Sequence, residues 1–331
     1  MTQPSRRELL GHCAVTALLG AVRIPTQAQT PQARIGILAV SSQEAARPSV
    51  DAFKKRLQEL GYAEGQNVRF VQRFADSDMH KLRRLADDLV SEGVAVIYAA
   101  STPEASAAKG ATSTIPIVFS FVNDPVIVKL VSSYARPGGN VTGIAQDTNV
   151  LGAKRLQYLK ELVPGAQRMA LLFDKEYADA CRLELDQIRD SAKQLKVDLE
   201  LVPFEGSATL DNALGRVRQA KPQALMSPVS GTFEIDAIKI GRFIREQKLP
   251  ALIEPLEAAQ YGAILSYGPD NLWASRRAAD YVARILKGTK PADLPIERPT
   301  RYDLVVNLKV AKELGVRVPE SLLLQASRII E

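Results

Sequence analysis

Short apolar segments alternate with amphipathic segments along most of the chain. In the first half, the apolar segments predict β-strands at residues 34–40, 68–74, 94–99 and 115–119, and the segments between them predict helices at 45–60, 79–91 and 103–111. A segment rich in glycine and proline, residues 136–140, then predicts a turn. After it the order repeats, with predicted strands at 168–173, 197–202, 224–227 and 251–253 and predicted helices at 178–195, 208–219 and 233–247.

This alternation predicts an α/β fold, because strand–helix repeats build parallel sheets with helices on both faces. The second series begins at residue 168, 134 residues after the first at residue 34, and repeats its order. We therefore expect two Rossmann-like lobes of one topology that face each other. Ligands of such sheets bind beyond the carboxyl ends of the strands, so the expected ligand site is a cleft between the lobes.

The composition is that of a globular protein with a large core: 46% of the 331 residues are hydrophobic and 24% are charged. The same numbers exclude intrinsic disorder, collagen-like repeats and a disulfide scaffold. A formal net charge of +6 over this length is a mild bias, and it does not indicate a nucleic-acid partner.

Histidine and cysteine are too scarce for several kinds of catalytic site. The two histidines are His12 and His80, and the two cysteines are Cys13 and Cys181. His80 lies where a helix is predicted to begin and is expected on the surface, so a zinc site, a Ser-His-Asp triad and a Cys-His dyad have no good candidate. Dinucleotide-binding, Walker and nucleophile-elbow motifs are also missing from the sequence. We expect no enzyme activity, no metal and no cofactor.

Residues 1–28 are predicted to be a secretory signal peptide. Arg6 and Arg7 form a twin-arginine pattern, a weakly apolar run follows at 9–22, and residues 26–28 (TQA) supply the small residues of a cleavage site. The apolar run is shorter than the ~20 residues that a transmembrane helix needs. We expect cleavage near residue 29, export by the twin-arginine or the Sec route, and a soluble periplasmic protein.

Several short motifs occur in the order in which a known family has them. They are LGYAEGQN at 60–67, STP at 101–103 with ATSTIPIV at 111–118, NDPV at 123–126, ARPGGNVTG at 135–143, SYGPD at 266–270 and KGTKPADLP at 287–295. Together they make the chain resemble, over about residues 34–319, the substrate-binding components of ABC transporters in the family that includes the tryptophan- and tyrosine-binding proteins. One departure is Asn123, where the family pattern has glycine.

The resemblance implies a type I periplasmic binding protein, in which the chain crosses three times between two lobes. The crossings are expected near 141–143, before Tyr267 and at 294–299, which assigns 33–143 and 267–294 to the first lobe and 144–266 and 295–331 to the second. It also implies a monomer that binds a small solute, an amino acid with an aromatic or branched side chain, in a cleft that closes. The implied partners are a cognate ABC permease in the inner membrane and its ATPase, with no nucleic acid.

Polar residues that directly follow predicted strands are the candidates for ligand contacts. In the first lobe these are Ser41, Ser42, Ser101, Thr102, Asp124 and Asp270. Ser101 and Thr102 open a helix, whose free backbone N–H groups favour a ligand's carboxylate. Asp124 and Asp270 are candidates for pairing with a ligand's ammonium group, with Asp270 preferred. For each of them the alternative is a role in capping a helix or a turn.

In the second lobe, Tyr177 and Ser230 follow strand ends and are predicted to contact the ligand, and Asp174 and Glu254 lie in equivalent places. Trp273, the only tryptophan, is expected to pack in the core rather than to stack on a ligand.

Four alternatives stay open at this level. A ligand could be an aromatic or other small carboxylate instead of an amino acid, and the protein could serve a membrane sensor instead of a permease. A secreted enzyme would be revealed by turnover. A repressor with the same two-lobed core would need an N-terminal helix-turn-helix, which residues 1–33 do not supply.

Overall fold

The computed structural model describes residues 32–331 except 77, 147–150, 176–177, 179–180, 229–231 and 255–257. The predicted signal peptide and two candidate ligand contacts, Tyr177 and Ser230, lie outside the described residues. Within the described part the chain forms two separate sheets, each flanked by helices, so the predicted α/β class with two parallel-sheet lobes is confirmed.

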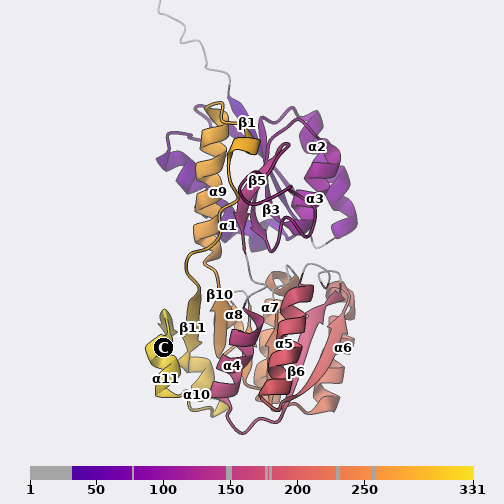
Figure 1. Ribbon diagram of the computed structural model, residues 1–331, viewed down its shortest axis with the longest axis vertical. Coiled ribbons are helices and arrows are strands. Elements are labelled where there is room, and N and C mark those ends of the chain that lie inside the picture. Colours follow the sequence, from indigo (N-terminus) through magenta and orange to yellow (C-terminus); the bar gives the residue numbers. More distant parts are fainter. Residues whose placement is uncertain are drawn as a thin grey trace, which may run out of the picture. The chain divides into compact units, whose positions relative to one another are not determined.

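The first lobe is a parallel sheet with helices on both faces (Figure 1). Its spatial order is β2-β1-β3-β4-β5. The strands are β1 (Ala33–Ala39), β2 (Val68–Phe74), β3 (Val96–Ser101), β4 (Ile117–Val122) and β5 (Val141–Ala145). The helices are α1 (Gln43–Glu59), α2 (Leu82–Ser91) with a 3-10 turn before it at Met79–Lys81, α3 (Thr102–Ala111) and α9 (Asn271–Leu286).

The second lobe is built around the order β12-β11-β10-β9-β8-β6-β7, in which the described pairings are parallel except that of β10 with β11. The strands are β6 (Arg168–Asp174), β7 (Asp198–Phe204), β8 (Ala224–Ser227), β9 (Ala251–Ile253), β10 (Leu265–Gly268), β11 (Asp303–Asn307) and β12 (Arg328–Ile330). The helices are α4 (Gly152–Leu162), α5 (Arg182–Gln194), α6 (Gly206–Ala220), α7 (Thr232–Gln247), α8 (Ala258–Tyr261), α10 (Leu308–Leu314) and α11 (Glu320–Gln325).

Apolar side chains hold each sheet between its helices. On one face of the first sheet, α1 and α9 pack side by side, and α2 and α3 cover the other face (Figure 1). The rings of Phe53 on α1 and Tyr98 on β3 stack with their centroids 4.2 Å apart. Because both side chains are at most 1% exposed, each is expected to stabilise the lobe by about 1.5–3 kcal/mol through burial.

Helix ends follow from local sequence. The Ser42 hydroxyl accepts a hydrogen bond from the Ala45 N–H and starts α1, which ends before Gly61, a residue with φ +90°. The Asn307 side chain caps α10 in the same way by accepting from the Val310 N–H at 2.9 Å. The first helix was predicted at 45–60, and α1 begins two residues earlier because Ser42 caps it.

Backbone pairing shows which sheet the residues near the three expected crossings join. Strand β5 continues the first sheet to Ala145, and β10 pairs with β9 and β11, so Tyr267 belongs to the second sheet. Glu297 still pairs with β5, since its N–H donates to the Gly143 carbonyl at 3.2 Å and its carbonyl accepts from the Ala145 N–H at 2.8 Å. These hydrogen bonds attach Glu297 to the edge of the first sheet and Tyr267 to the second sheet.

Helix α9 packs against α1 in the core of the first lobe. Among the described residues, no helix is both long enough and apolar enough to cross a lipid bilayer.

Candidate functional site

Serine or threonine residues lie where two neighbouring strands of the first sheet lead into the helices that follow them. β1 is followed by Ser41, which is buried, and by Ser42, whose hydroxyl caps α1. β3 ends at Ser101, and Thr102 begins α3. Because β1 pairs with β3, the structure brings these four predicted residues to one edge of the sheet.

A buried carboxylate that the sequence reasoning missed joins the two junctions. The Glu104 side chain is 1% exposed; its Oε1 accepts from the Val40 N–H at 2.8 Å, and its Oε2 accepts from the Ser101 hydroxyl. Burial raises the pKa of Glu104, although the hydrogen bonds from Ser101 and Val40 act in the opposite direction. The signal was present in the sequence, since Ser101 and Glu104 have the S-x-x-E spacing of a capping box.

The two first-lobe aspartates both make capping hydrogen bonds. Asp124 Oδ1 accepts from two N–H groups, of Val126 and Ile127, each at 3.0 Å. Asp270 Oδ1 accepts from the N–H groups of Leu272 at 2.8 Å and Trp273 at 3.0 Å, and so caps α9. These are the capping roles that the sequence left open as the alternative, and a role in ligand binding would come in addition to them.

Asp270 is not a desolvated charge in this structure. Its side chain is 44% exposed, and its Oδ2 lies 3.9 Å from Nη2 of Arg276. Trp273, one turn further along α9, is half-buried and packs against the core of the first lobe, as predicted.

In the second lobe, two acidic residues that follow strand ends are deeply buried. Asp174 ends β6 and is 2% exposed, and Glu254 follows β9 and is 1% exposed. Glu254 forms an ion pair with Nη2 of Arg155, and its Oε1 accepts from Nε2 of Gln146 at 3.3 Å. Gln146 is the first residue after β5, so this contact connects the first crossing with an end of the second sheet.

Arg155 is the centre of a buried ionic cluster. Its side chain, on α4, is fully buried and pairs with Glu184 on α5 as well as with Glu254. Its Nε also donates to the Tyr267 carbonyl at 2.8 Å, at the second crossing. Burial raises the pKa of Glu184, although Arg155 opposes this shift. Arg155 therefore holds three segments of the second lobe together where the chain enters and leaves it.

The sequence pattern concealed this cluster. Leu151, Leu159 and Leu162 are buried, and Arg155 lies on the same helical face at the spacing of four from Leu151 and Leu159. An arginine at that place interrupts the apolar stripe, so α4 was not predicted. A lone arginine on an otherwise apolar face was the signal for a buried ion pair.

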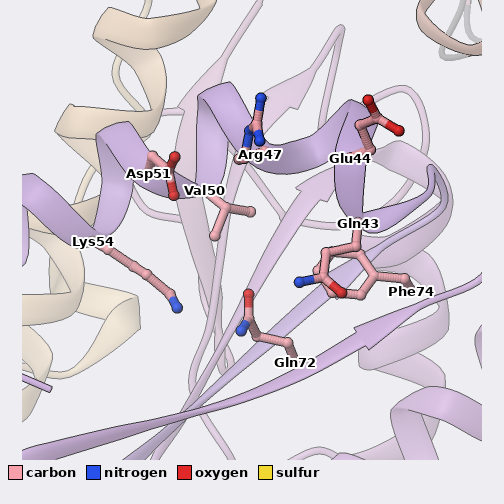
Figure 2. A pocket seen from close by; sticks show the side chains of 8 residues that line it. All are labelled: Gln43, Glu44, Arg47, Val50, Asp51, Lys54, Gln72 and Phe74. Atoms are coloured by element: carbon pink, nitrogen blue, oxygen red, sulfur yellow. The ribbon is translucent and has the colours of Figure 1, made fainter. Parts of the chain in front are cut away.

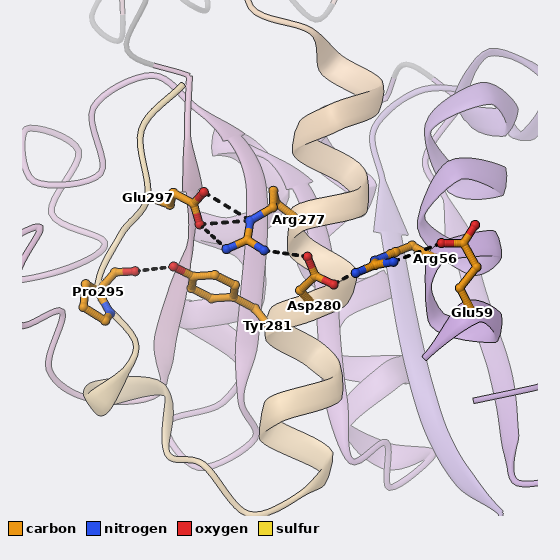
Figure 3. Close-up of polar contacts among 7 residues, drawn as sticks. All are labelled: Arg56, Glu59, Arg277, Asp280, Tyr281, Pro295 and Glu297. Carbon is orange, nitrogen blue, oxygen red and sulfur yellow. Dashed lines mark hydrogen bonds and ion pairs between the residues drawn. The ribbon is translucent and has the colours of Figure 1, made fainter. Parts of the chain in front are cut away.

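A second polar network, in the first lobe, fixes the third crossing (Figure 3). Arg277 on α9 forms a bidentate pair with Glu297, with Nη2 2.8 Å from Oε2, and its Nη1 lies 2.7 Å from Oδ2 of Asp280. Arg56 of α1 donates to Oδ1 of the same Asp280 at 2.8 Å and pairs with Glu59. Hydrogen bonding to Glu297 raises the pKa of Arg277.

Tyr281 adds a further link to the same crossing, because its hydroxyl donates to the Pro295 carbonyl at 2.6 Å (Figure 3). Burial, reinforced by the nearby Glu297 carboxylate, raises the pKa of Tyr281 to about 12. The hydroxyl therefore stays a donor at every physiological pH.

A groove of about 450 Å³ lies beside the first turns of α1 (Figure 2). Charged groups of both signs and two amides surround a small apolar floor. The lining comes from α1 and β2: Gln43, Glu44, Arg47, Val50, Asp51, Lys54, Gln72 and Phe74. It adjoins the strand-end residues only where α1 begins after Ser42.

The described residues contain no group of three or more histidine, cysteine, aspartate or glutamate side chains arranged to hold a metal ion. His80 is exposed on the 3-10 turn before α2, as predicted. Cys181 is buried, and burial raises the pKa of its thiol.

Comparison with known proteins places this architecture in a family. Residues 34–330 match the family described as ABC transporter substrate binding protein. A tyrosine-binding protein of Clostridioides difficile is 27% identical over 290 residues, which cover 86% of this chain and 82% of that protein.

Two solved structures are similar over nearly their whole length. A conserved domain protein of Vibrio cholerae superposes with a TM-score of 0.83 at 27% identity, covering 90% of this chain and 99% of that one. An ABC domain from Streptococcus pneumonia in complex with L-Trp superposes with a TM-score of 0.82 at 24% identity, covering 90% and 100%. The fold is that of the type I periplasmic binding proteins, as the sequence motifs implied. With the family matched over almost all of its described residues, the chain belongs to the substrate-binding proteins of ABC transporters.

Proposed function

We propose that this protein is the periplasmic receptor of an ABC importer and that it binds an aromatic amino acid. The observation that carries the proposal is the family match over residues 34–330. The ligand class is supported by the ligands named for two relatives, tyrosine and L-tryptophan.

The first lobe supplies hydroxyl groups suited to a small polar ligand. Ser41, Ser42, Ser101 and Thr102 lie at the ends of two paired strands, where parallel sheets bind their ligands. Tyr177 and Ser230 are proposed to contact the ligand from the second lobe, and Asp124 and Asp270 are proposed to face its ammonium group in addition to their capping roles.

A ligand that contacts both lobes stabilises the arrangement in which they approach each other. The polar network around Arg277 and the ionic cluster around Arg155 support a closing motion, because each fixes crossing segments to one lobe. The motion is then confined to the few residues between these anchors. We expect binding and release with no turnover, because the matching family is one of substrate-binding proteins.

Calorimetric titration of protein purified from the periplasm tests the ligand class. L-tryptophan, L-tyrosine, L-leucine and indole-3-propionate are compared, and the radius of gyration is measured by scattering with each binder. We expect an aromatic amino acid to bind, to lower the radius of gyration and, at one hundred times its Kd, to stabilise the protein by about 2.7 kcal/mol. Binding of indole-3-propionate alone would move the assignment to aromatic carboxylates, and a binder that leaves the scattering unchanged would contradict closure.

Export and delivery are tested separately. Replacement of Arg6 and Arg7 by lysine should block export if the twin-arginine route is used, whereas continued export indicates the Sec route. Uptake of the labelled ligand should depend on the permease and the ATPase of the cognate transporter. Light scattering should report a monomer.

A further inference from the structure

The side chain of Asn271, the first residue of α9, is buried, and its amide oxygen has no partner. The residue is 7% exposed, and its Oδ1 accepts no hydrogen bond from any described residue. A buried carbonyl oxygen without a donor costs free energy because it has lost its hydrogen bonds to water, and such groups are rare in folded proteins. The unpartnered oxygen therefore indicates a donor that the described residues do not supply.

The polar groups next to Asn271 are, by contrast, hydrogen-bonded to one another. The Ser275 hydroxyl, one turn further along α9, donates to the Asn271 backbone carbonyl at 3.1 Å and accepts from the Tyr98 hydroxyl at 3.3 Å. The Tyr98 hydroxyl also lies 2.8 Å from Oγ of Ser120, which donates to the Ala100 carbonyl at 3.2 Å. A chain of hydrogen bonds thus links the first turn of α9 to the end of β3, and Asn271 Oδ1 has no part in it.

Asn271 lies at the edge of the first sheet where the strands end. The first turn of α9 is linked to Ala100, the residue before Ser101, through the hydrogen bonds just described. The other end of α9 lies near the beginnings of the strands, since Tyr62, which precedes β2, donates its hydroxyl to the Ala283 carbonyl at 3.4 Å. The edge where strands end is the one at which parallel sheets bind ligands, and it also carries the predicted serine and threonine contacts.

We propose that Asn271 is a specificity-determining residue of the ligand site and that its Oδ1 accepts a hydrogen bond from the ligand's ammonium group. The inference rests on the proposed function, because an amino acid brings the N–H donor that no described residue supplies to this oxygen. The terminal torsion of an asparagine side chain is soft, so the oxygen can turn towards a ligand that reaches the strand ends.

The neighbouring Asp270 offers a ligand something different. Its side chain is 44% exposed, and its Oδ1 already accepts two N–H groups of α9. Burial of a neutral amide costs much less than burial of a carboxylate, so Asn271 can wait for its donor in a position where an aspartate would need a cation. Asp270 supplies a solvated charge, and Asn271 supplies a desolvated acceptor with a defined direction.

Asn271→Leu tests this role, because it replaces the amide by an apolar group of similar volume. The amide oxygen has no partner to lose, so the midpoint of urea unfolding without ligand should stay the same or rise. A hydrogen bond to a charged group is worth about tenfold to a hundredfold in affinity. In calorimetric titrations with L-tryptophan and L-tyrosine, we therefore expect at least a tenfold loss for whichever the wild-type protein binds. Asn271→Ala, which adds no bulk, should lose affinity to the same extent.

The matched control is Asn307→Leu. Asn307 is 3% exposed and also lies at the start of a helix, but its amide is fully engaged. Its Nδ2 donates to the Ala259 carbonyl at 2.6 Å, and its Oδ1 accepts from the Val310 N–H at 2.9 Å. Asn307→Leu should lower the midpoint of urea unfolding and leave the affinity within threefold of wild type.

The outcomes separate this inference from the proposed function. If the wild-type protein binds neither aromatic amino acid and no other amino acid, the proposed function is overturned, and this inference with it. If the wild-type protein binds but Asn271→Leu keeps its affinity within tenfold, or loses as much stability as Asn307→Leu, only the inference is overturned.

A crystal structure of the wild-type protein with its amino acid provides a second measurement that needs no variant to fold. We expect the ligand's ammonium nitrogen within about 3.2 Å of Asn271 Oδ1. A water molecule bound to Oδ1 in place of the ligand, or a ring group of the ligand there, would refute the proposal.

Discussion

Replacement of Arg155 by methionine should destabilise the second lobe strongly. The guanidinium group is fully buried and pairs with two carboxylates, those of Glu184 and Glu254, which are at most 2% exposed. Methionine fills much of the volume but leaves both carboxylates without their cation and the Tyr267 carbonyl without its donor. Breaking a buried ion pair costs about 3–5 kcal/mol, a large part of the 5–15 kcal/mol that stabilises an ordinary domain.

The magnitude is limited because the two carboxylates can take up protons. Protonating a stranded carboxylate costs about 1.4 kcal/mol for each unit by which the pKa of that group has to rise. Protonation therefore keeps the total loss of unfolding free energy near the range for one broken ion pair. For a lobe of ordinary domain size, 3–5 kcal/mol lowers Tm by about 6–20 °C. A variant that combines Arg155→Met with Glu184→Gln and Glu254→Gln should recover at least half of the loss, because it buries no stranded charge.

The assay follows the two lobes separately. Trp273, the only tryptophan, lies in the first lobe, so its fluorescence reports that lobe while far-ultraviolet circular dichroism reports both. In urea, Arg155→Met should move the dichroism transition by more than the fluorescence transition. The control is Arg83→Met, which removes an arginine that is 62% exposed in a surface ion pair and should cost less than about 0.5 kcal/mol. Equal effects of the two substitutions would refute the assignment of Arg155 as a buried structural cation.

Three further outcomes are expected. Burial raises the pKa of Glu104, so the folded protein holds a proton that the unfolded chain releases. The unfolding free energy of the wild-type protein should therefore fall relative to that of Glu104→Gln as the pH rises above about 4.5. Parallel curves of unfolding free energy against pH for the two proteins would contradict this. Asp270→Ala should lower the unfolding free energy by about 0.5–2 kcal/mol through loss of the α9 cap, and Asp270→Asn by less, as urea titration can measure. Gly143→Ala should prevent normal folding, because its Cβ would lie 2.2 Å from the Phe119 carbonyl oxygen, and soluble expression with wild-type dichroism would argue against this packing.

The predicted and observed elements agree best where the apolar pattern is strong. The strand at 68–74 was predicted with the bounds that β2 has, and the helix 79–91 differs only in its first turn, which is a 3-10 turn. Strand β5 was missed because its five residues contain Gly143 and were assigned to a crossing. Helix α4 was missed because Arg155 interrupts its apolar face. In both cases the residue that departs from the apolar pattern has a place in the folded protein. Gly143 lies against the Phe119 backbone, and Arg155 pairs with buried carboxylates.

The candidate site was predictable in its positions but not in its interactions. Parallel strands end at one edge of a sheet, so residues after strands could be named as candidates from the chain alone, and Ser41, Ser42, Ser101 and Thr102 lie together as that rule implies. Whether Asp270 is a cap or a free charge depends on its distances to the Leu272 and Trp273 N–H groups, and these are properties of the folded helix end.

Hydrophobic periodicity is a local property, and it determined by itself that this chain forms strands and helices in two repeated series. The tertiary structure alone decided which distant partners the buried charged groups contact. Arg155 meets Glu184 and the Tyr267 carbonyl across 29 and 112 residues of chain, separations at which no sequence pattern connects them. Such pairs form because a charge removed from water must find its partner in space, wherever along the chain that partner lies.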